Sequence, residues 1–364
     1  MQNAQAMYAQ NINQLVTLLQ GLGPQRTVLI EGDMGIGKST LLTMLKERLP
    51  DYTAAYFDCT TKDVGDIFIP AVGEVDGEAS YVRFVPNEEF GLHHGKPVLL
   101  MFDEFGKANP AVKQAVRRTM LERTVGAKPL PKGSIVFATT NLGAEGVGDL
   151  LPAHTRNRVT VIRMRKPSAT EWIEWGVNND IHPTVLGWVK DTPQVMQSFT
   201  DVADPEENPY IFHPQAAGRT AFVTPRSLHA ASDILHTPGL DEDTVTSALI
   251  GTIGPKAALD MAAYIQLAHK LPKRDAIKTD PENAMIPDSV SAVCMVVFNA
   301  VASMTHDFID PWMTYLERLD ATSQSLFANN VRGKDYKHRD IVMSNKRFQT
   351  WSRTNNHLFA ADKV

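Results

Sequence analysis

The sequence has little cysteine, no long apolar run and no large excess of charge of either sign, and each absence excludes a class of protein. Cys59 and Cys294 are the only cysteines in 364 residues, too few for a disulfide framework or a zinc site built on cysteine. The net charge of −5 gives no overall field that draws the chain to nucleic acid or to an anionic membrane. We therefore expect a protein of the reducing cytoplasm.

Membrane-spanning and secretory segments are also missing from the pattern. The longest apolar stretch, residues 290–304, contains Ser291, Asn299 and Ser303 and is too short to span a bilayer, so we expect a buried helix there and no membrane partner. Residues 1–13 hold no Lys or Arg and no apolar core, unlike a signal peptide. The composition, 43% hydrophobic and 21% charged, is that of a globular protein with ample chain to bury a core.

One segment carries a complete phosphate-binding motif. Residues 31–40 read EGDMGIGKST, fill the template G-x-x-x-x-G-K-[ST], and lie between a β-branched run and a helical pattern. The glycines let backbone N–H groups turn towards phosphates, and the following helix adds the positive end of its dipole. Lys38 is expected to reach the β- and γ-phosphates of ATP, and Ser39 to place its hydroxyl on Mg²⁺. The predicted nucleotide-binding residues are Gly32, Asp33, Met34, Gly35, Ile36, Gly37, Lys38, Ser39 and Thr40.

Strand and helix patterns alternate through the first half of the chain. An amphipathic helix before Gly21 leads into a first strand, and helices are expected at 38–49 and 111–122. Alternation of this kind predicts an α/β fold with a parallel sheet, helices on both faces, and a ligand at the carboxyl ends of the strands. The predicted strands are residues 27–30, 54–57, 97–102, 135–139 and 159–164.

An insertion at residues 66–84 separates the second and third strands. Apolar runs flank Asp76-Gly77 there, which predicts a β-hairpin, with a decorative surface loop as the alternative. After residue 164 the periodicity is helical, with a capping box at Ser168 and a cap followed by proline at Thr224. We expect four parts: a lead-in helix at 1–25, a nucleotide-binding domain at 26–165, a helical lid at 166–272 and a helical C-terminal extension at 273–364.

Two further strands end in polar residues. Asp103 and Glu104 follow the apolar run 98–102, and Asn141 follows the run 135–140. Asp103 would hold Mg²⁺ through its water shell, and Glu104 would be the general base that activates water. Asn141 can hydrogen-bond the γ-phosphate or orient that water.

The order of these motifs, followed by residues 151–159, resembles the AAA+ ATPases, and within them the MoxR-like, dynein-related branch. The resemblance covers residues 25–235 and includes the hairpin insertion. It implies a P-loop NTPase fold of the AAA+ type, a parallel sheet flanked by helices and followed by an all-α lid and a helical C-terminal extension. The arginine finger of the family falls on Arg158, with Arg156 close enough to compete, and its second sensor falls on Arg226.

The same resemblance implies an activity and partners. ATP and Mg²⁺ would be used in a homo-oligomeric ring, by likeness a hexamer, that remodels or matures a partner protein complex, in many relatives with a protein carrying a von Willebrand A domain. The compact chain would suit a bacteriophage or a bacterium. Two departures, at residues 86–95 and 123–133, fall where relatives carry elements that handle substrate.

Two other functions stay open. A nucleic-acid motor or loader would use the same core and needs a basic channel. Residues 332–347 are locally basic and contain an aromatic residue, the ingredients of a phosphate-contacting patch, but a solvated helix or loop face is the favoured interpretation of this stretch. A nucleotide-gated scaffold that does not hydrolyse ATP is the third reading. His93-His94 could suggest a metal, but no third ligand occurs at a recognisable spacing.

Overall fold

The computed structural model describes residues 8–142, 157–216 and 218–359. The chain divides into two compact units, Met1–Lys166 and Pro167–Val364. No helix within the described ranges is long and apolar enough to cross a membrane.

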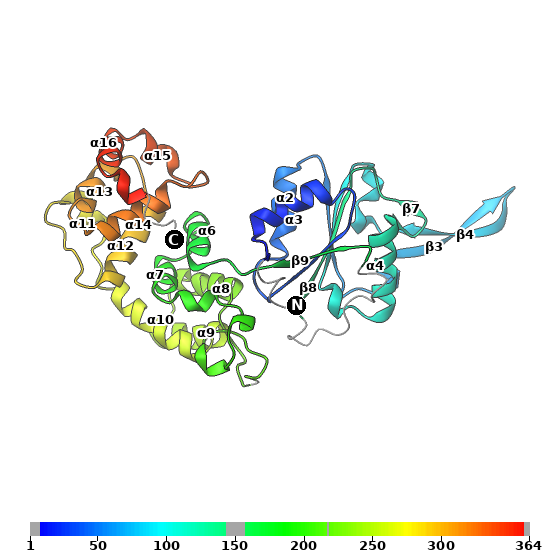
Figure 1. Ribbon diagram of the computed structural model, residues 1–364, viewed down its shortest axis with the longest axis horizontal. Coiled ribbons are helices and arrows are strands. Elements are labelled where there is room, and N and C mark those ends of the chain that lie inside the picture. The colour runs from blue at the N-terminus through cyan, green and yellow to red at the C-terminus, as the bar shows by residue number, and fades with distance from the viewer. Residues whose placement is uncertain (1–7, 143–156, 217, 360–364) are drawn as a thin grey trace. The chain divides into compact units, whose positions relative to one another are not determined.

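The first unit is built on a five-stranded parallel sheet (Figure 1). Its strands agree with the five predicted from the sequence to within two residues at each end. Strand β1 lies between β8 and β9, the fourth and fifth strands of the sheet in chain order, so the chain crosses over after β1. The phosphate-binding segment follows β1 at the carboxyl edge of the sheet. The predicted α/β fold is confirmed. In spatial order the strands are β2 (Thr53–Asp58), β5 (Val98–Asp103), β8 (Ile135–Asn141), β1 (Val28–Gly32) and β9 (Thr160–Met164).

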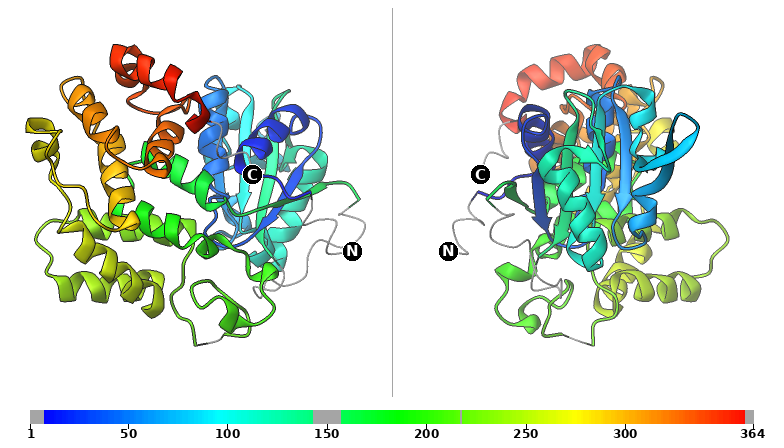
Figure 2. Two further views of the ribbon diagram at one scale, coloured as in Figure 1. Left: turned by 60° about the vertical axis from the view of Figure 1, so that its left-hand side comes forward. Right: turned by 90° about the vertical axis from the view of Figure 1, so that its right-hand side faces the viewer.

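Helices cover both faces of this sheet (Figures 1 and 2). On one face, α2 (Ile12–Leu22) and α3 (Thr40–Arg48) bury leucines against Ile30, Met101 and Phe137. On the other, α4 (Pro110–Glu122) packs against Phe57 and Phe102. Every residue of β5 and β8 is buried, as expected for central strands covered on both sides.

The insertion after β2 forms the predicted hairpin, which extends away from the sheet (Figure 1). Strands β3 (Phe68–Val75) and β4 (Glu78–Pro86) are antiparallel. Asp76 and Gly77 join them with φ of 56° and 82°, the left-handed backbone that a two-residue turn needs. A second hairpin lies in the short segment after α4. Its two strands have two residues each, β6 (Thr124–Val125) and β7 (Lys128–Pro129). Single helical turns are η1 (Val64–Asp66), η2 (Glu88–Phe90), η3 (Leu92–His94) and η4 (Phe105–Lys107).

The second unit is helical throughout its described residues, as predicted. Ser168 caps α6 by a reciprocal capping box with Glu171, and Thr224 caps α8 by accepting from the backbone of Ser227. Its longer helices are α6 (Ala169–Asn178), α7 (Pro183–Asp191), α8 (Pro225–His236), α9 (Glu242–Ile253), α10 (Pro255–Ala268), α11 (Arg274–Thr279), α12 (Val290–Ala302), α13 (Ile309–Leu316), α14 (Ala321–Val331), α15 (Arg339–Ser344) and α16 (Lys346–Thr354). Single turns are η6 (Pro193–Met196), η7 (Phe199–Asp201), η8 (Pro205–Glu207) and η9 (Asn356–Phe359).

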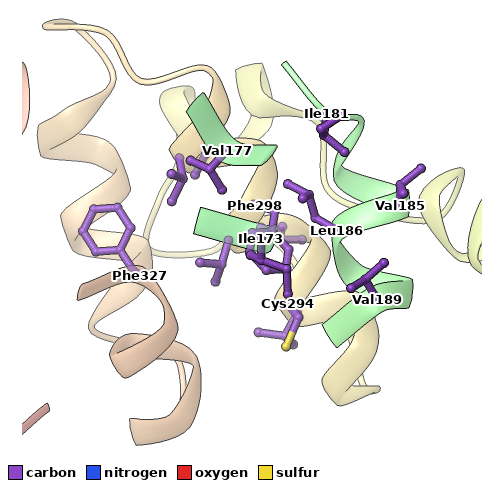
Figure 3. Close-up of a cluster of buried hydrophobic side chains, with 14 of the residues drawn as sticks. Ile173, Val177, Ile181, Val185, Leu186, Val189, Cys294, Phe298 and Phe327 are labelled. Carbon is purple, nitrogen blue, oxygen red and sulfur yellow. The ribbon is translucent and has the colours of Figure 1, made fainter. Parts of the chain in front are cut away.

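Helix α12 lies at the centre of the second unit. Its Cys294 and Phe298 face side chains of α6 and α7 that include Ile173 and Leu186 (Figure 3). The buried helix predicted from residues 290–304 is thus observed, and its polar Asn299 donates to the carbonyl of Met295 one turn earlier. One hydrophobic core includes residues from 172 to 358. The predicted division of this half at residue 272 remains a prediction.

Candidate functional site

The phosphate-binding segment forms the loop between β1 and α3. Gly35 and Gly37 have φ of 68° and 92°, a conformation that glycine adopts without the clash of a Cβ atom. The backbone N–H groups of Gly35, Ile36 and Gly37 donate to no acceptor within the described ranges. Successive N–H groups that point into one concavity, at the start of a helix, form a binding site for an anion.

Lys38 crosses this loop with a buried side chain, 6% exposed. Its ammonium group donates to the carbonyls of Gly32 and Asp33, at 2.9 and 2.8 Å, and to Oδ1 of Asn141 at 2.7 Å. Asn141 ends β8, so the lysine connects the loop after β1 to the end of the neighbouring strand. The sequence predicted that these two residues would act on one ligand, and the structure brings them together.

Asp103 ends β5 and is also buried. Its Oδ2 accepts from the hydroxyl of Ser39 at 2.8 Å and from the hydroxyl of Tyr56 at 2.9 Å. Its Oδ1 accepts from the hydroxyl of Thr139 and from the backbone N–H of Glu104, the latter at 3.1 Å. Four donors saturate the acceptor positions of a carboxylate, so this side chain is held in one orientation.

Glu104 follows in a left-handed conformation, with φ of 51° and ψ of 34°, which costs a residue with a Cβ atom about 1–2 kcal/mol. Its carboxylate lies 2.9 Å from the ammonium of Lys107 and accepts long hydrogen bonds from Nδ2 of Asn141, at 3.3 and 3.4 Å. Backbone strain of this kind concentrates at functional sites. The contacts described above connect four side chains in one continuous series: Lys38, Asn141, Glu104 and Lys107.

Three of these contacts were missed at the level of sequence: those of Tyr56, Thr139 and Lys107. Burial, followed by the hydrogen bond to Asp103, raises the pKa of Tyr56 above its usual value, so the phenol stays protonated and donates. The sequence signal that could have identified Tyr56 is the alternation of side chains along β2, which places Tyr56 on the face opposite the buried Phe57. The contact of Lys107 could not be foreseen, since it depends on the left-handed turn at Glu104.

The donor set fits Mg²⁺ and a polyphosphate. The Ser39 hydroxyl and Asp103 Oδ2 are hard oxygen donors placed beside the phosphate-binding loop, the type of ligand that Mg²⁺ selects together with substrate phosphates. Within the described ranges no three His, Cys, Asp or Glu side chains are grouped closely enough to hold a metal by themselves. The rings of His93 and His94 contact each other, with centroids 3.9 Å apart and planes tilted by 43°.

The structure describes two of the three arginines singled out from the sequence. Arg158 is exposed and precedes β9, which runs parallel to β1, so it lies at the sheet edge opposite the loop. Arg156 is outside the described residues. Arg226 is exposed in the first turn of α8, in the second unit.

Three of the six Lys and Arg residues in the basic stretch 332–347 contact acceptors elsewhere in the chain. Lys337 forms an ion pair with Asp180, and Arg347 lies 2.9 Å from Glu317. Arg332 donates to the carbonyl of Phe359. These contacts support the interpretation of residues 332–347 as a solvated helix face.

Comparisons with known proteins give only distant likenesses. No protein-family model matches the chain, and no curated protein matches it. Among solved structures, the chain is similar to the RuvB Holliday junction branch migration motor of Thermotoga maritima, with 15% identity over 74% of this chain and 75% of that chain and a TM-score of 0.35. A mutant of the same RuvB gives 15% identity over 74% and 76%, with a TM-score of 0.37. Scores this low carry no argument, so the fold rests on the strand order and the loop described above.

Proposed function

We propose that the chain binds ATP with Mg²⁺ and hydrolyses it to ADP and phosphate. The observation that carries this proposal is the meeting of five side chains at the carboxyl edge of one parallel sheet, beside an anion-binding loop. They come from separate segments of the sequence, and their chemistry is complementary to a metal-bound triphosphate. The five are Lys38, Ser39, Asp103, Glu104 and Asn141.

Binding uses groups that already face the loop. The N–H groups of residues 35–37 would donate to phosphate oxygens, and Lys38 would exchange its two carbonyl partners for the β- and γ-phosphates. This exchange is favourable because a hydrogen bond between two charged groups is stronger than one to a neutral carbonyl.

Ser39 and Asp103 would hold the metal, which supplies positive charge to the phosphate oxygens. Asp103 is fixed for this role by Thr139 and by the backbone of Glu104. A carboxylate that is already oriented needs no rearrangement when charge arrives, which is how electrostatic stabilisation becomes effective.

Glu104 would act as the general base. It would take a proton from a water whose oxygen attacks the γ-phosphorus, while the bond from that phosphorus to the bridging oxygen of ADP breaks. Asn141 contacts both Glu104 and Lys38, so it would orient the base towards the phosphate that Lys38 binds.

Arg158 would serve a neighbouring copy. It lies at the sheet edge away from its own loop, so it can reach a γ-phosphate only in another subunit, and such a trans arginine makes hydrolysis depend on assembly. Arg226 would act within its own subunit, from the lid. We propose on this basis a ring-forming AAA+ protein of the MoxR-like branch, a hexamer in the cytoplasm of a bacterium or in its phage.

The work done by such a ring would be remodelling or maturation of a partner protein complex, with a von Willebrand A domain protein as the candidate partner. The nucleic-acid motor is not favoured, because two basic residues of the stretch 332–347, Lys337 and Arg347, are paired with acidic side chains of the same chain. The non-hydrolysing scaffold is not favoured either, because Glu104 is in place.

The test is ATP turnover against protein concentration, with particle size recorded in the same samples, for wild type, Arg158→Ala and Arg156→Ala. Turnover per chain should rise as rings form, and Arg158→Ala should abolish it without loss of ATP binding. Turnover that does not depend on concentration, or that survives Arg158→Ala but not Arg156→Ala, contradicts the assignment of Arg158. Rings that bind ATP and never hydrolyse it favour the scaffold, and activity that DNA stimulates and salt suppresses favours the motor.

A further inference from the structure

Tyr56 stands beside the proposed metal site although no motif includes it. It lies on the edge strand β2, whose register pairs Tyr56 with Met101 and Asp58 with Asp103. Ala55 and Phe57 are buried on the α4 face of the sheet, so alternation turns Tyr56 to the α3 face, together with Met101. From there its hydroxyl donates to Asp103 Oδ2 at 2.9 Å.

The donors around Asp103 leave no acceptor position free. Oδ1 accepts from the hydroxyl of Thr139 and the backbone N–H of Glu104, and Oδ2 accepts from the hydroxyls of Ser39 and Tyr56. When a hydrated metal binds beside Ser39, a water in its hydration shell must donate a hydrogen bond to Asp103. One of the four present donors therefore has to leave.

The four donors differ in their freedom to move. Thr139 is fully buried and Glu104 donates through its backbone. Ser39 is the N-cap residue of α3 and can keep its proton on Asp103 while its oxygen turns to the metal. Tyr56 is 47% exposed, so its hydroxyl can move into solvent and be hydrated there. Tyr56 is therefore the donor most easily displaced.

We propose that the Tyr56 hydroxyl occupies the position on Asp103 that a water of the metal's hydration shell takes when Mg²⁺ binds with nucleotide. Tyr56 is then a positioning residue: it holds Asp103 in place while the site is empty and competes with the metal for it. The competition raises the Mg²⁺ concentration that tight nucleotide binding requires. This inference rests on the proposed nucleotide site.

The experiment measures ADP affinity by calorimetry at a series of free Mg²⁺ concentrations, so that hydrolysis does not enter. Tyr56→Phe removes the hydroxyl and keeps the ring. For each protein the measured quantity is the Mg²⁺ concentration at which half of the Mg²⁺-dependent gain in ADP affinity is reached. In Tyr56→Phe this concentration should be about 2- to 12-fold lower than in wild type, the range that corresponds to the net free energy of one hydrogen bond. Affinity for ADP without Mg²⁺ should not change.

Tyr52→Phe is the matched control. Its hydroxyl lies near Gly133, in the loop before β8, at the edge of the sheet opposite Asp103. This variant should behave as wild type does. Tyr56→Leu, which removes the ring as well, should shift the Mg²⁺ dependence in the same direction as Tyr56→Phe, and thermal unfolding should show that each variant is folded.

The outcomes separate the inference from the function on which it rests. An unchanged or higher Mg²⁺ requirement in Tyr56→Phe, with normal ADP binding, overturns the competition and leaves the nucleotide site standing. Failure of folded wild type to bind ADP at any Mg²⁺ concentration overturns the proposed function and the inference together.

Discussion

Lys107 provides a sharp test of how Glu104 is positioned. Its ammonium lies 2.9 Å from the Glu104 carboxylate, and the two side chains are 46% and 30% exposed. The other contacts of that carboxylate, from Asn141, are longer than 3.2 Å. In Lys107→Met the side chain keeps a similar length but loses its charge, so Glu104 loses its shortest restraint.

The size of the effect follows from the exposure of the pair. An exposed ion pair contributes about 0.2–1 kcal/mol, so the free energy of unfolding should fall by less than about 1 kcal/mol. If the same free energy orients the base, kcat falls by up to about fivefold. KM should stay constant, because Lys107 makes no described contact with the phosphate-binding loop.

The assay is steady-state ATP turnover with urea unfolding as the stability measurement. Lys107→Arg keeps the cation and should retain at least half of kcat. Lys132→Met, a change at an exposed lysine in the loop before β8, should leave both quantities unchanged. An unchanged kcat in Lys107→Met would refute the positioning role, and a raised kcat would show that the ion pair restrains the base.

Two further predictions concern the helical unit. Trp312 is fully buried between Phe308, Tyr315 and Phe327, so Trp312→Ala should lower the free energy of unfolding by about 3–5 kcal/mol in urea titrations, and a loss below about 1 kcal/mol would contradict this packing. Burial and the charge of His236 lower the pKa of His182 to about 4 from 6.5. The unfolded chain therefore binds that proton more readily, and stability should fall as the pH decreases from 6.5 towards 4, by at most about 3 kcal/mol. His182→Asn keeps the cap on α7 and should flatten that dependence; equal slopes for the two proteins would rule His182 out.

The sheet and the loop were predictable because their signals are local. Apolar runs mark strands such as β5 and β8, and a strand that ends in Asp103 or Asn141 places that side chain at the carboxyl edge. The phosphate-binding template fixes its own backbone through glycine. These inferences required no knowledge of which strands are neighbours.

Other features depend on tertiary context. Tyr56 reaches Asp103 only because β2 pairs with β5 in one particular register, which a sequence does not display. Helix α14 buries Ser323, Ser325 and Asn329, so its core-facing side does not appear as an apolar stripe, and its limits were not predicted. The role of Arg158 needs a second copy of the chain and stays a prediction.

The central claim is that Glu104 activates water on a nucleotide held by the loop. The most direct measurement is ATP hydrolysis by Glu104→Gln, with ATP binding measured on the same protein. Because glutamine keeps the size of the side chain but cannot accept the proton, hydrolysis should fall by about 100-fold or more while binding persists. Hydrolysis at the wild-type rate by a Glu104→Gln protein that still binds ATP would contradict the account.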